Sequence, residues 1–245
     1  MDLIDSDLTL AALVTHRPEL AAHLDALGLD FCCGGQRRLV DAVDAVGLDL
    51  AETIATLQAV PVAPTGSTES DADNWNTLGI AELVDHLEST HHVYLRDALV
   101  RIDPVAEKVA GVHGERHPEL TEVLATFRAL RAELEPHLAN EEHVLFPIIR
   151  ELADATAAPS FHGGALHDPI AAMSSEHDRA GELLARLRAL TGAYTVPDDG
   201  CASYRLLYAG LAELEADTHL HVHKENNLLF PAAIETARRL TDRFS

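Results

Sequence analysis

Two copies of one short motif place a histidine and a glutamate four residues apart. The first copy contains His137 and Glu141, and the second contains His221 and Glu225, 84 residues further along the chain. Both copies continue into the tripeptide Leu-Phe-Pro. Residues at i and i+4 share one face of a helix, so each pair can direct a nitrogen and a carboxylate at one point. Imidazole and carboxylate groups that converge in this way are typical ligands of a transition metal.

The residues around both motifs predict that the two glutamates are buried. Leucine, valine and phenylalanine flank each motif on the helical stripe that carries its histidine. An ionised carboxylate in an apolar interior is very costly unless a cation compensates it. Two such carboxylates at matching depths, Glu141 and Glu225, therefore require a cation, and a pair of metal ions supplies it. Because a carboxylate has two oxygens, each glutamate can bridge both ions.

Two further histidines complete the predicted ligand set. Apolar residues follow His92 and His177 at the third, seventh and tenth positions, which places both histidines on the core side of their helices. They precede His137 and His221 by 45 and 44 residues. A set rich in imidazole suits iron, and manganese or zinc less exclusively. The predicted metal ligands are His92, His137, Glu141, His177, His221 and Glu225.

The apolar stripe gives two answers for the histidine of the first helix. Leu83 and Leu87, read forward, point to His91, whereas the apolar residues further on point back to His92. The spacing of the repeat favours His92, and His91 stays as the alternative. Several other polar residues fall off the stripe, and we expect solvated positions for His143, His219, His223 and Glu142. Caps, loop residues or surface groups are expected at His86, His113, His117, His162 and His167.

Cys32 and Cys33 are adjacent in the sequence Asp-Phe-Cys-Cys-Gly-Gly. Adjacent cysteines form a disulfide only with strain, and three cysteines make no disulfide framework. The two glycines and the helix expected after them place the thiols near a helix N-terminus, which lowers a thiol pKa. This favours a reactive or metal-handling role for Cys32 and Cys33 over the alternative of two small buried side chains. Cys201 is expected to be structural.

The elements that must position these residues are helices. Leucine and alanine are abundant and aromatic residues make up only 4%, which favours an all-α protein. Short breaks separate four long helical patterns and make neighbours antiparallel, as in an up-down-up-down four-helix bundle. The repeat indicates a duplicated helical hairpin. The patterns cover about 77–110, 118–153, 166–191 and 200–240.

Two further segments precede the bundle. Residues 1–60 predict a small helical domain around the Cys-Cys-Gly-Gly sequence. Residues 61–76 contain Pro, Thr, Gly, Ser and Asp without periodicity, which predicts a linker. The bundle domain with the metal site then covers residues 77–245.

The charge balance excludes two classes of partner. The chain has 18 basic and 40 acidic side chains and a net charge of −22. Such a surface repels nucleic-acid phosphates and anionic lipid heads, so we expect neither nucleic acid nor membrane as a partner. The acidic start of the chain is unlike a secretory signal and no apolar run is long enough to span a bilayer, so we predict a cytoplasmic protein with reduced thiols.

These residues resemble a known family. The two His-x-x-x-Glu motifs and the Ser-Glu-His-Asp sequence around His177 are similar to the hemerythrin-like domain. The Cys-Cys-Gly-Gly sequence resembles the N-terminal module of the Repair of Iron Centres family, and the resemblance covers nearly the whole chain. It implies a non-haem di-iron centre with an oxo or hydroxo bridge, bridging Glu141 and Glu225, the four terminal histidines named above, and the vicinal Cys32 and Cys33. Residues 157–166 look like a longer middle loop than the family's.

The resemblance also implies a function. We expect a di-iron protein that repairs iron–sulfur clusters damaged by nitric oxide or oxidative stress, with iron–sulfur proteins as recipients of donated iron. The alternatives are a redox enzyme that reduces nitric oxide and a hemerythrin-like protein that binds or senses oxygen. A homodimer is left open as an assembly.

Overall fold

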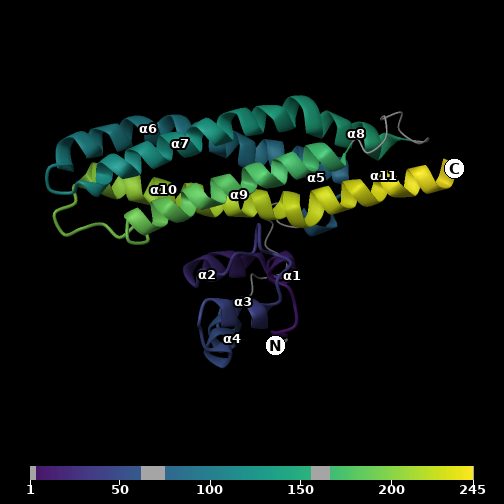
Figure 1. The fold of residues 1–245 in the computed structure, drawn as a ribbon, viewed down its shortest axis with the longest axis horizontal. Helices are drawn as coiled ribbons and strands as arrows, with labels where there is room; N and C mark the ends of the chain where they lie inside the picture. Colours follow the sequence, from purple (N-terminus) through teal and green to yellow (C-terminus); the bar gives the residue numbers. More distant parts are fainter. Residues whose placement is uncertain (1–3, 62–74, 156–165, 245) are drawn as a thin grey trace.

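The computed structural model describes residues 4–61, 75–155 and 166–244. Within these residues the fold is all-α, as predicted, and a group of short helices packs beside a bundle of long ones (Figure 1). The predicted linker over 61–76 and the predicted loop over 157–166 lie almost wholly outside the described residues. The short helices are α1 (Leu10–His16), α2 (Ala21–Ala26), α3 (Leu39–Ala45) and α4 (Leu50–Gln58).

Four antiparallel helical rods make up the bundle (Figure 1). Rods one, two and four each join two α-helices, and rod three is a single helix. Helix α7 packs against α6 and α9, and α10 packs against the same two neighbours. The predicted up-down-up-down four-helix bundle is confirmed. The rods are α5 (Ile80–Leu87) with α6 (Val93–His113), α7 (Glu119–Asn140) with α8 (Phe146–Asp154), α9 (His167–Leu190), and α10 (Ala202–Lys224) with α11 (Phe230–Phe244).

Local signals in the sequence explain where the short helices begin and end. Thr9 and Asp49 are the N-caps of α1 and α4, and each side chain accepts a hydrogen bond from the backbone N–H three residues later. Pro18 begins the 3₁₀ turn that leads into α2. Gly28 follows α2 with a φ of +71°, a conformation that favours glycine. The short helices enclose their own apolar core, to which Val222 of α10 also contributes.

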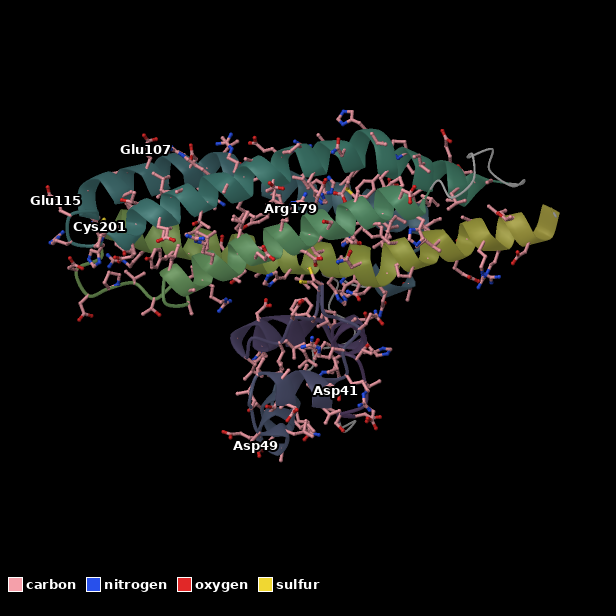
Figure 2. The ribbon with its side chains drawn as sticks, viewed as in Figure 1. Asp41, Asp49, Glu107, Glu115, Arg179 and Cys201 are labelled. Atoms are coloured by element: carbon pink, nitrogen blue, oxygen red, sulfur yellow. The ribbon has the colours of Figure 1, made fainter. Side chains whose placement is uncertain are left out.

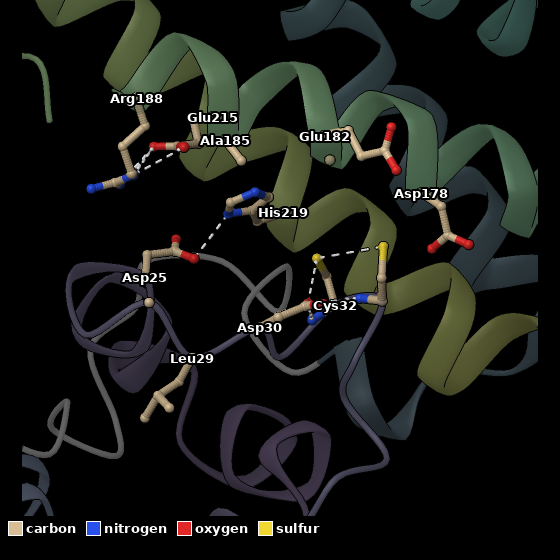
Figure 3. Close-up of a pocket in the computed structure, with 13 residues that line it drawn as sticks. Asp25, Leu29, Asp30, Cys32, Asp178, Glu182, Ala185, Arg188, Glu215 and His219 are labelled. Carbon is tan, nitrogen blue, oxygen red and sulfur yellow. Dashed lines mark hydrogen bonds and ion pairs between the residues drawn. The ribbon is translucent and has the colours of Figure 1, made fainter. Parts of the chain in front are cut away.

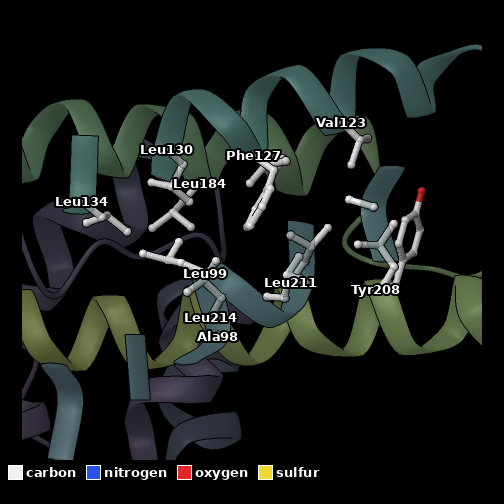
Figure 4. Close-up of a cluster of buried hydrophobic side chains, with 14 of the residues drawn as sticks. Ala98, Leu99, Val123, Phe127, Leu130, Leu134, Leu184, Tyr208, Leu211 and Leu214 are labelled. Atoms are coloured by element: carbon white, nitrogen blue, oxygen red, sulfur yellow. The ribbon is translucent and has the colours of Figure 1, made fainter. Parts of the chain in front are cut away.

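The core of the bundle reflects the sequence repeat. Phe127 and Leu130 of α7 occupy the same repeat positions as Leu211 and Leu214 of α10, and all four side chains are at most 1% exposed. Figure 4 shows them meeting between the rods. Truncating a buried leucine to alanine typically costs about 2–5 kcal/mol, so this layer contributes strongly to the stability of the bundle.

Three of the rods contain one π-helical turn each, at the height of the predicted metal ligands. These turns are η4 (Glu88–His92), η5 (Glu141–Leu145) and η6 (Glu225–Leu229). A proline follows closely after η5 and η6, at Pro147 and Pro231, and proline lacks the backbone donor of a regular helical turn. In η4, the hydroxyls of Ser89 and Thr90 donate to backbone carbonyls four residues earlier instead.

Turn η4 explains why the apolar stripe of the first rod is consistent with either His91 or His92 as a metal ligand. A π turn contains one residue more than an α-helical turn, so it rotates the following residues by about 100° relative to an unbroken helix. The stripe of Leu83 and Leu87 therefore continues one residue later than a regular helix predicts. His91 fits the stripe before the turn and His92 fits the stripe after it.

The outer face of the first rod carries acidic side chains (Figure 2). Glu107 and Glu115 on the first rod, for example, are exposed. No helix among the described residues is both long enough and apolar enough to cross a bilayer. The cytoplasmic location stays a prediction.

The N-terminal domain docks on α10 and η6 through the loop that contains the two cysteines. The ring of Phe31 contacts His219 and His223 edge-on, with centroids 6.2 and 5.6 Å apart. The side-chain amide of Asn227 donates to the backbone oxygen of Cys32 at 3.0 Å. The prediction of a solvated position was wrong for His223, which is fully buried, and His219 is mostly buried. The physical reason is that this helix face is covered by the docked domain.

Gly35 is tightly packed between its own loop and η6. A Cβ there would overlap the backbone oxygen of Phe31 and lie 2.9 Å from Oδ1 of Asn227. We expect Gly35→Ala to lower the free energy of unfolding by about 1–3 kcal/mol, because the added methyl group forces the loop away from η6. Urea denaturation followed by circular dichroism measures this.

Gly111→Ala is the matched control for Gly35→Ala. Gly111 lies in α6 with open space around its Cα, so the same methyl group should raise the free energy of unfolding by about 0.5–1 kcal/mol. If both variants are equally stable, the close packing of the cysteine loop is not what holds the domain.

Candidate metal centre

The structure brings all six predicted metal ligands together in the bundle. They form two groups, each with two histidines, and both groups include Glu141 and Glu225. Within each group one ligand atom per residue lies within 4.8 Å of all the others. The first group adds His92 and His221, and the second adds His137 and His177.

The two oxygens of each glutamate face different histidine pairs. Oε2 of Glu141 lies 3.4 Å from Nε2 of His92, and Oε1 lies 3.4 Å from Nε2 of His137. For Glu225, Oε1 lies 3.2 Å from Nε2 of His221, and Oε2 lies 3.1 Å from Nε2 of His177. Ligand atoms at about 2.1 Å from a common ion are about 3 Å apart when they subtend a right angle. The observed separations of 3.1–3.4 Å are close to that value.

The polar atoms at this position lack the partners that a metal-free core would require. Among the described residues, both carboxylate oxygens of Glu141 and Glu225 and the Nε2 atoms of His92 and His221 are buried without a hydrogen bond. Nε2 of His137 faces Nε2 of His177 at 3.1 Å. Leaving so many buried polar atoms unpaired is very costly, and cations at these two positions would satisfy them. The residues present therefore fit a pair of metal ions.

The surroundings of Glu141 and Glu225 shift the pKa values of the two carboxyl groups in opposite directions. Both are fully buried. Burial, reinforced by the negative charge of Glu225, holds the pKa of Glu141 well above its ordinary value. Burial also acts on Glu225, but the facing His221 and His177 hold its pKa well below the ordinary value. Two carboxylates this close cannot both stay ionised without added positive charge.

Outer partners orient three of the histidines, and sequence reasoning missed them. Nδ1 of His92 is 2.9 Å from Glu142, Nδ1 of His137 is 2.8 Å from Glu176, and Nδ1 of His177 is 3.0 Å from Oδ1 of Asn226. Such bonds fix the tautomer that leaves Nε2 free to bind a metal. Each partner directly follows or precedes a ligand in sequence, which was the signal available.

The solvated position predicted for Glu142 was wrong. Its carboxylate is about three-quarters buried and bonded to both His92 and Arg96. Burial favours the neutral acid, but these two hydrogen bonds hold the pKa of Glu142 below its ordinary value. Glu142 lies one residue off the helical stripe and reaches His92 because the two rods are adjacent.

His91 lies beside the cluster but outside both groups. Its Nδ1 is 2.9 Å from Oδ1 of Asp217, and Nζ of Lys224 donates to its Nε2 at 2.8 Å. Its ring stacks on His221 with centroids 5.7 Å apart. Burial, followed by the charge of Lys224, lowers the pKa of His91 to about 3. Because both ring nitrogens are already bonded, the geometry favours His92 over His91 as a ligand.

The cysteine pair lies in the loop that contacts η6. Cys32 is buried and Cys33 is partly exposed, with the two Sγ atoms 3.9 Å apart. Hydrogen bonding to Cys33, burial and the nearby carboxylate of Asp30 hold the pKa of the Cys32 thiol well above its ordinary value. The expected lowering was wrong for Cys32, because α3 begins only at Leu39, six residues after Cys33.

Cys201 has the environment that was expected for Cys32. It is exposed and caps α10, and its Sγ is 3.2 Å from Nε2 of the buried His113. The backbone N–H of Tyr204 and then His113 lower the pKa of Cys201 to about 7. The His113 side chain is thus a buried partner of this thiol, where a cap or surface group was expected.

We expect alkylation of Cys201 by iodoacetamide to accelerate with a midpoint near pH 7, since only the thiolate reacts. Cys32 should need a distinctly higher pH. Peptide mass spectrometry after timed labelling reports both sites, and His113→Ala should move the Cys201 midpoint upward. A Cys201 midpoint near that of a free thiol would contradict this description.

A four-helix bundle with converging histidines and glutamates is consistent with a hemerythrin-type domain, and residues 81–233 match the family of the hemerythrin HHE cation binding domain. Such a domain implies a non-haem iron cofactor. Residues 6–61 match a second family, described as a domain of unknown function, DUF542.

Curated relatives align with most of the chain. A probable iron-sulfur cluster repair protein of Haemophilus influenzae is 35% identical over 84% of this chain and 87% of its own. The iron-sulfur cluster repair proteins YtfE of Yersinia pseudotuberculosis and Cronobacter sakazakii are 33% and 35% identical, over 92% and 93% of this chain and 96% of theirs. The chain belongs to this family of iron-sulfur cluster repair proteins.

Proposed function

We propose that the six clustered side chains hold two iron ions, with Glu141 and Glu225 bridging them together with an oxo or hydroxo group. The observation that supports this most is the division of each carboxylate between two histidine pairs. A single ion would contact only the glutamate oxygens that face one of the two histidine pairs. His92 and His221 would bind one ion, and His137 and His177 the other.

The proposed function is repair of iron–sulfur clusters damaged by nitric oxide or oxidative stress, by donation of iron to the damaged protein. The names of the relatives support it. Histidine and glutamate bind iron only when deprotonated, so such a site can release its iron on protonation. The cysteine loop is the proposed exit, since adjacent residues of η6 contact both sides: Asn226 bonds to His177 and Asn227 bonds to the Cys32 backbone.

The test of donation uses an enzyme whose iron–sulfur cluster has been damaged by nitric oxide. Iron-loaded protein is expected to restore activity in the presence of a chelator that removes free iron, and the iron-free protein is not. The Cys32→Ser, Cys33→Ser double variant should retain its iron and restore activity more slowly. Restoration no better than that of ferrous iron plus chelator would show that the protein is not a donor.

The number of protein ligands favours binding of nitric oxide or oxygen as a small ligand of the centre. Nitric oxide reduction is therefore a second candidate function. Each group supplies four ligand residues, whereas iron with nitrogen and oxygen ligands is commonly six-coordinate. Gas chromatography decides between the candidates. Nitrous oxide released on mixing the diferrous protein with nitric oxide would support reduction, and its absence would exclude it.

A further inference from the structure

A cavity of about 510 Å³ lies between the N-terminal domain and the bundle (Figure 3). Its walls come from the cysteine loop, α9 and α10, and both Cys32 and Cys33 line it. Two basic side chains of the lining are paired with carboxylates, Arg188 with Glu215 at 2.6 Å and His219 with Asp25 at 2.9 Å. The remaining charged side chains are acidic, so the cavity attracts cations. They are Asp30, Asp178 and Glu182.

Three potential ligands converge on the wall of this cavity. Sγ of Cys32 lies 3.9 Å from Sγ of Cys33 and 3.2 Å from Oδ1 of Asp30. Two thiolates on one tetrahedral ion at about 2.3 Å are about 3.8 Å apart, and a thiolate and a carboxylate oxygen are about 3.5 Å apart. A disulfide would require the sulfurs to close to about 2.05 Å. The observed spacing matches shared coordination of an ion far better than a bond between the sulfurs.

The loop holds these ligands in place before any ion arrives. The carboxylate of Asp30 accepts the backbone N–H groups of Cys32, Cys33 and Gly34 at 2.8–3.0 Å. Asn227 fixes the loop from the other side by its bond to the Cys32 carbonyl. Oδ1 accepts two of these bonds and Oδ2 accepts one, so Oδ2 keeps a lone pair for a metal. Prior ordering of ligands in this way reduces the entropy lost on binding.

We propose that Asp30, Cys32 and Cys33 form a second metal site, distinct from the centre in the bundle, which takes one divalent transition-metal ion from the cavity. Mixed sulfur and oxygen ligation suits ions of intermediate softness, such as ferrous iron or zinc. Binding replaces the two thiol protons, so two protons leave for each ion bound. A fourth position opens on the cavity, where water or a ligand of a recipient protein can bind.

The second site extends the proposed function, because donated iron would bind there last before it leaves the protein. The existence of the site does not depend on donation. Cobalt(II) is the probe, added in increments to the iron-loaded full chain under anaerobic conditions. The centre in the bundle offers no sulfur ligand, so a thiolate-to-cobalt charge-transfer band in the difference spectrum arises only at a cysteine. We expect the band to saturate at one cobalt per chain, with the iron content unchanged.

Three variants locate the band. The Cys32→Ser, Cys33→Ser double variant should lose it, and Asp30→Asn should weaken cobalt binding by about tenfold. Cys201→Ser, which removes the remaining thiol, should leave it unchanged. Absence of the band, its survival in the double variant, or its loss in Cys201→Ser would each overturn the second site. Failure of iron donation with an intact cobalt site would instead refute only the proposed function.

Discussion

Glu141→Ala and Glu225→Ala are each expected to reduce the iron bound per purified chain from two ions to less than one. Each glutamate belongs to both candidate ligand groups, so either change removes one ligand from both of the proposed ions at once. Loss even of an outer hydrogen-bond partner weakens a metal site by about 10–100-fold, and loss of a shared ligand should exceed that. Iron analysis and the visible spectrum of the purified variants measure the effect.

Glu133→Ala is the matched control for this prediction. Glu133 lies on the same helix as His137, but its side chain is 41% exposed and pairs with Arg179 at the surface. Its iron content should equal that of the unaltered protein. Two irons retained in Glu141→Ala or Glu225→Ala would show that the buried carboxylates are not ligands.

Removing iron is expected to lower the melting temperature of the protein by about 10 °C. At free iron a thousandfold above its dissociation constant, binding stabilises the folded state by about 4 kcal/mol. For a chain of this size, each kcal/mol moves the melting temperature by about 2–4 °C. The effect follows from the burial of Glu141 and Glu225, because their mutual repulsion destabilises the folded chain when iron is absent. Differential scanning calorimetry before and after chelation measures it.

A neutral side chain at one of these positions provides the control for iron removal. Glu141→Gln retains the shape of the side chain and removes one negative charge, so the iron-free form should melt at or above the temperature of the unaltered iron-free protein. Chelator should then change its melting temperature little. An unaltered protein that melts at the same temperature with and without iron would contradict the link between the metal and stability.

The sequence predicted the bundle and the grouping of the six candidate side chains because both depend on short-range periodicity. The spacing of four between His137 and Glu141 is a property of one helix turn, and the repeat 84 residues later placed the second pair at the same depth. The apolar positions around Phe127 and Leu211 fixed the faces that meet in the core. None of these inferences needed knowledge of how distant segments pack.

Features that depend on packing between segments could not be predicted in this way. The buried position of His223 follows from the N-terminal domain docking over α10, which no helical periodicity shows. The bond from His92 to Glu142 joins two rods, and the raised pKa of Cys32 depends on how the loop folds back on Asp30. Periodicity assigns a residue to a face, but only the folded chain shows what covers that face.

The π-helical turns have a practical consequence for aligning this chain with others. Each of η4, η5 and η6 adds one residue to its helical turn. A sequence comparison that assumes a regular heptad repeat along a rod is therefore wrong by one residue from that turn onward, at the candidate metal site. Alignments of distant family members should therefore be anchored separately on either side of each turn, with a one-residue gap allowed between. A homologue that lacks the insertion between Leu87 and His92 would present a different imidazole to the iron.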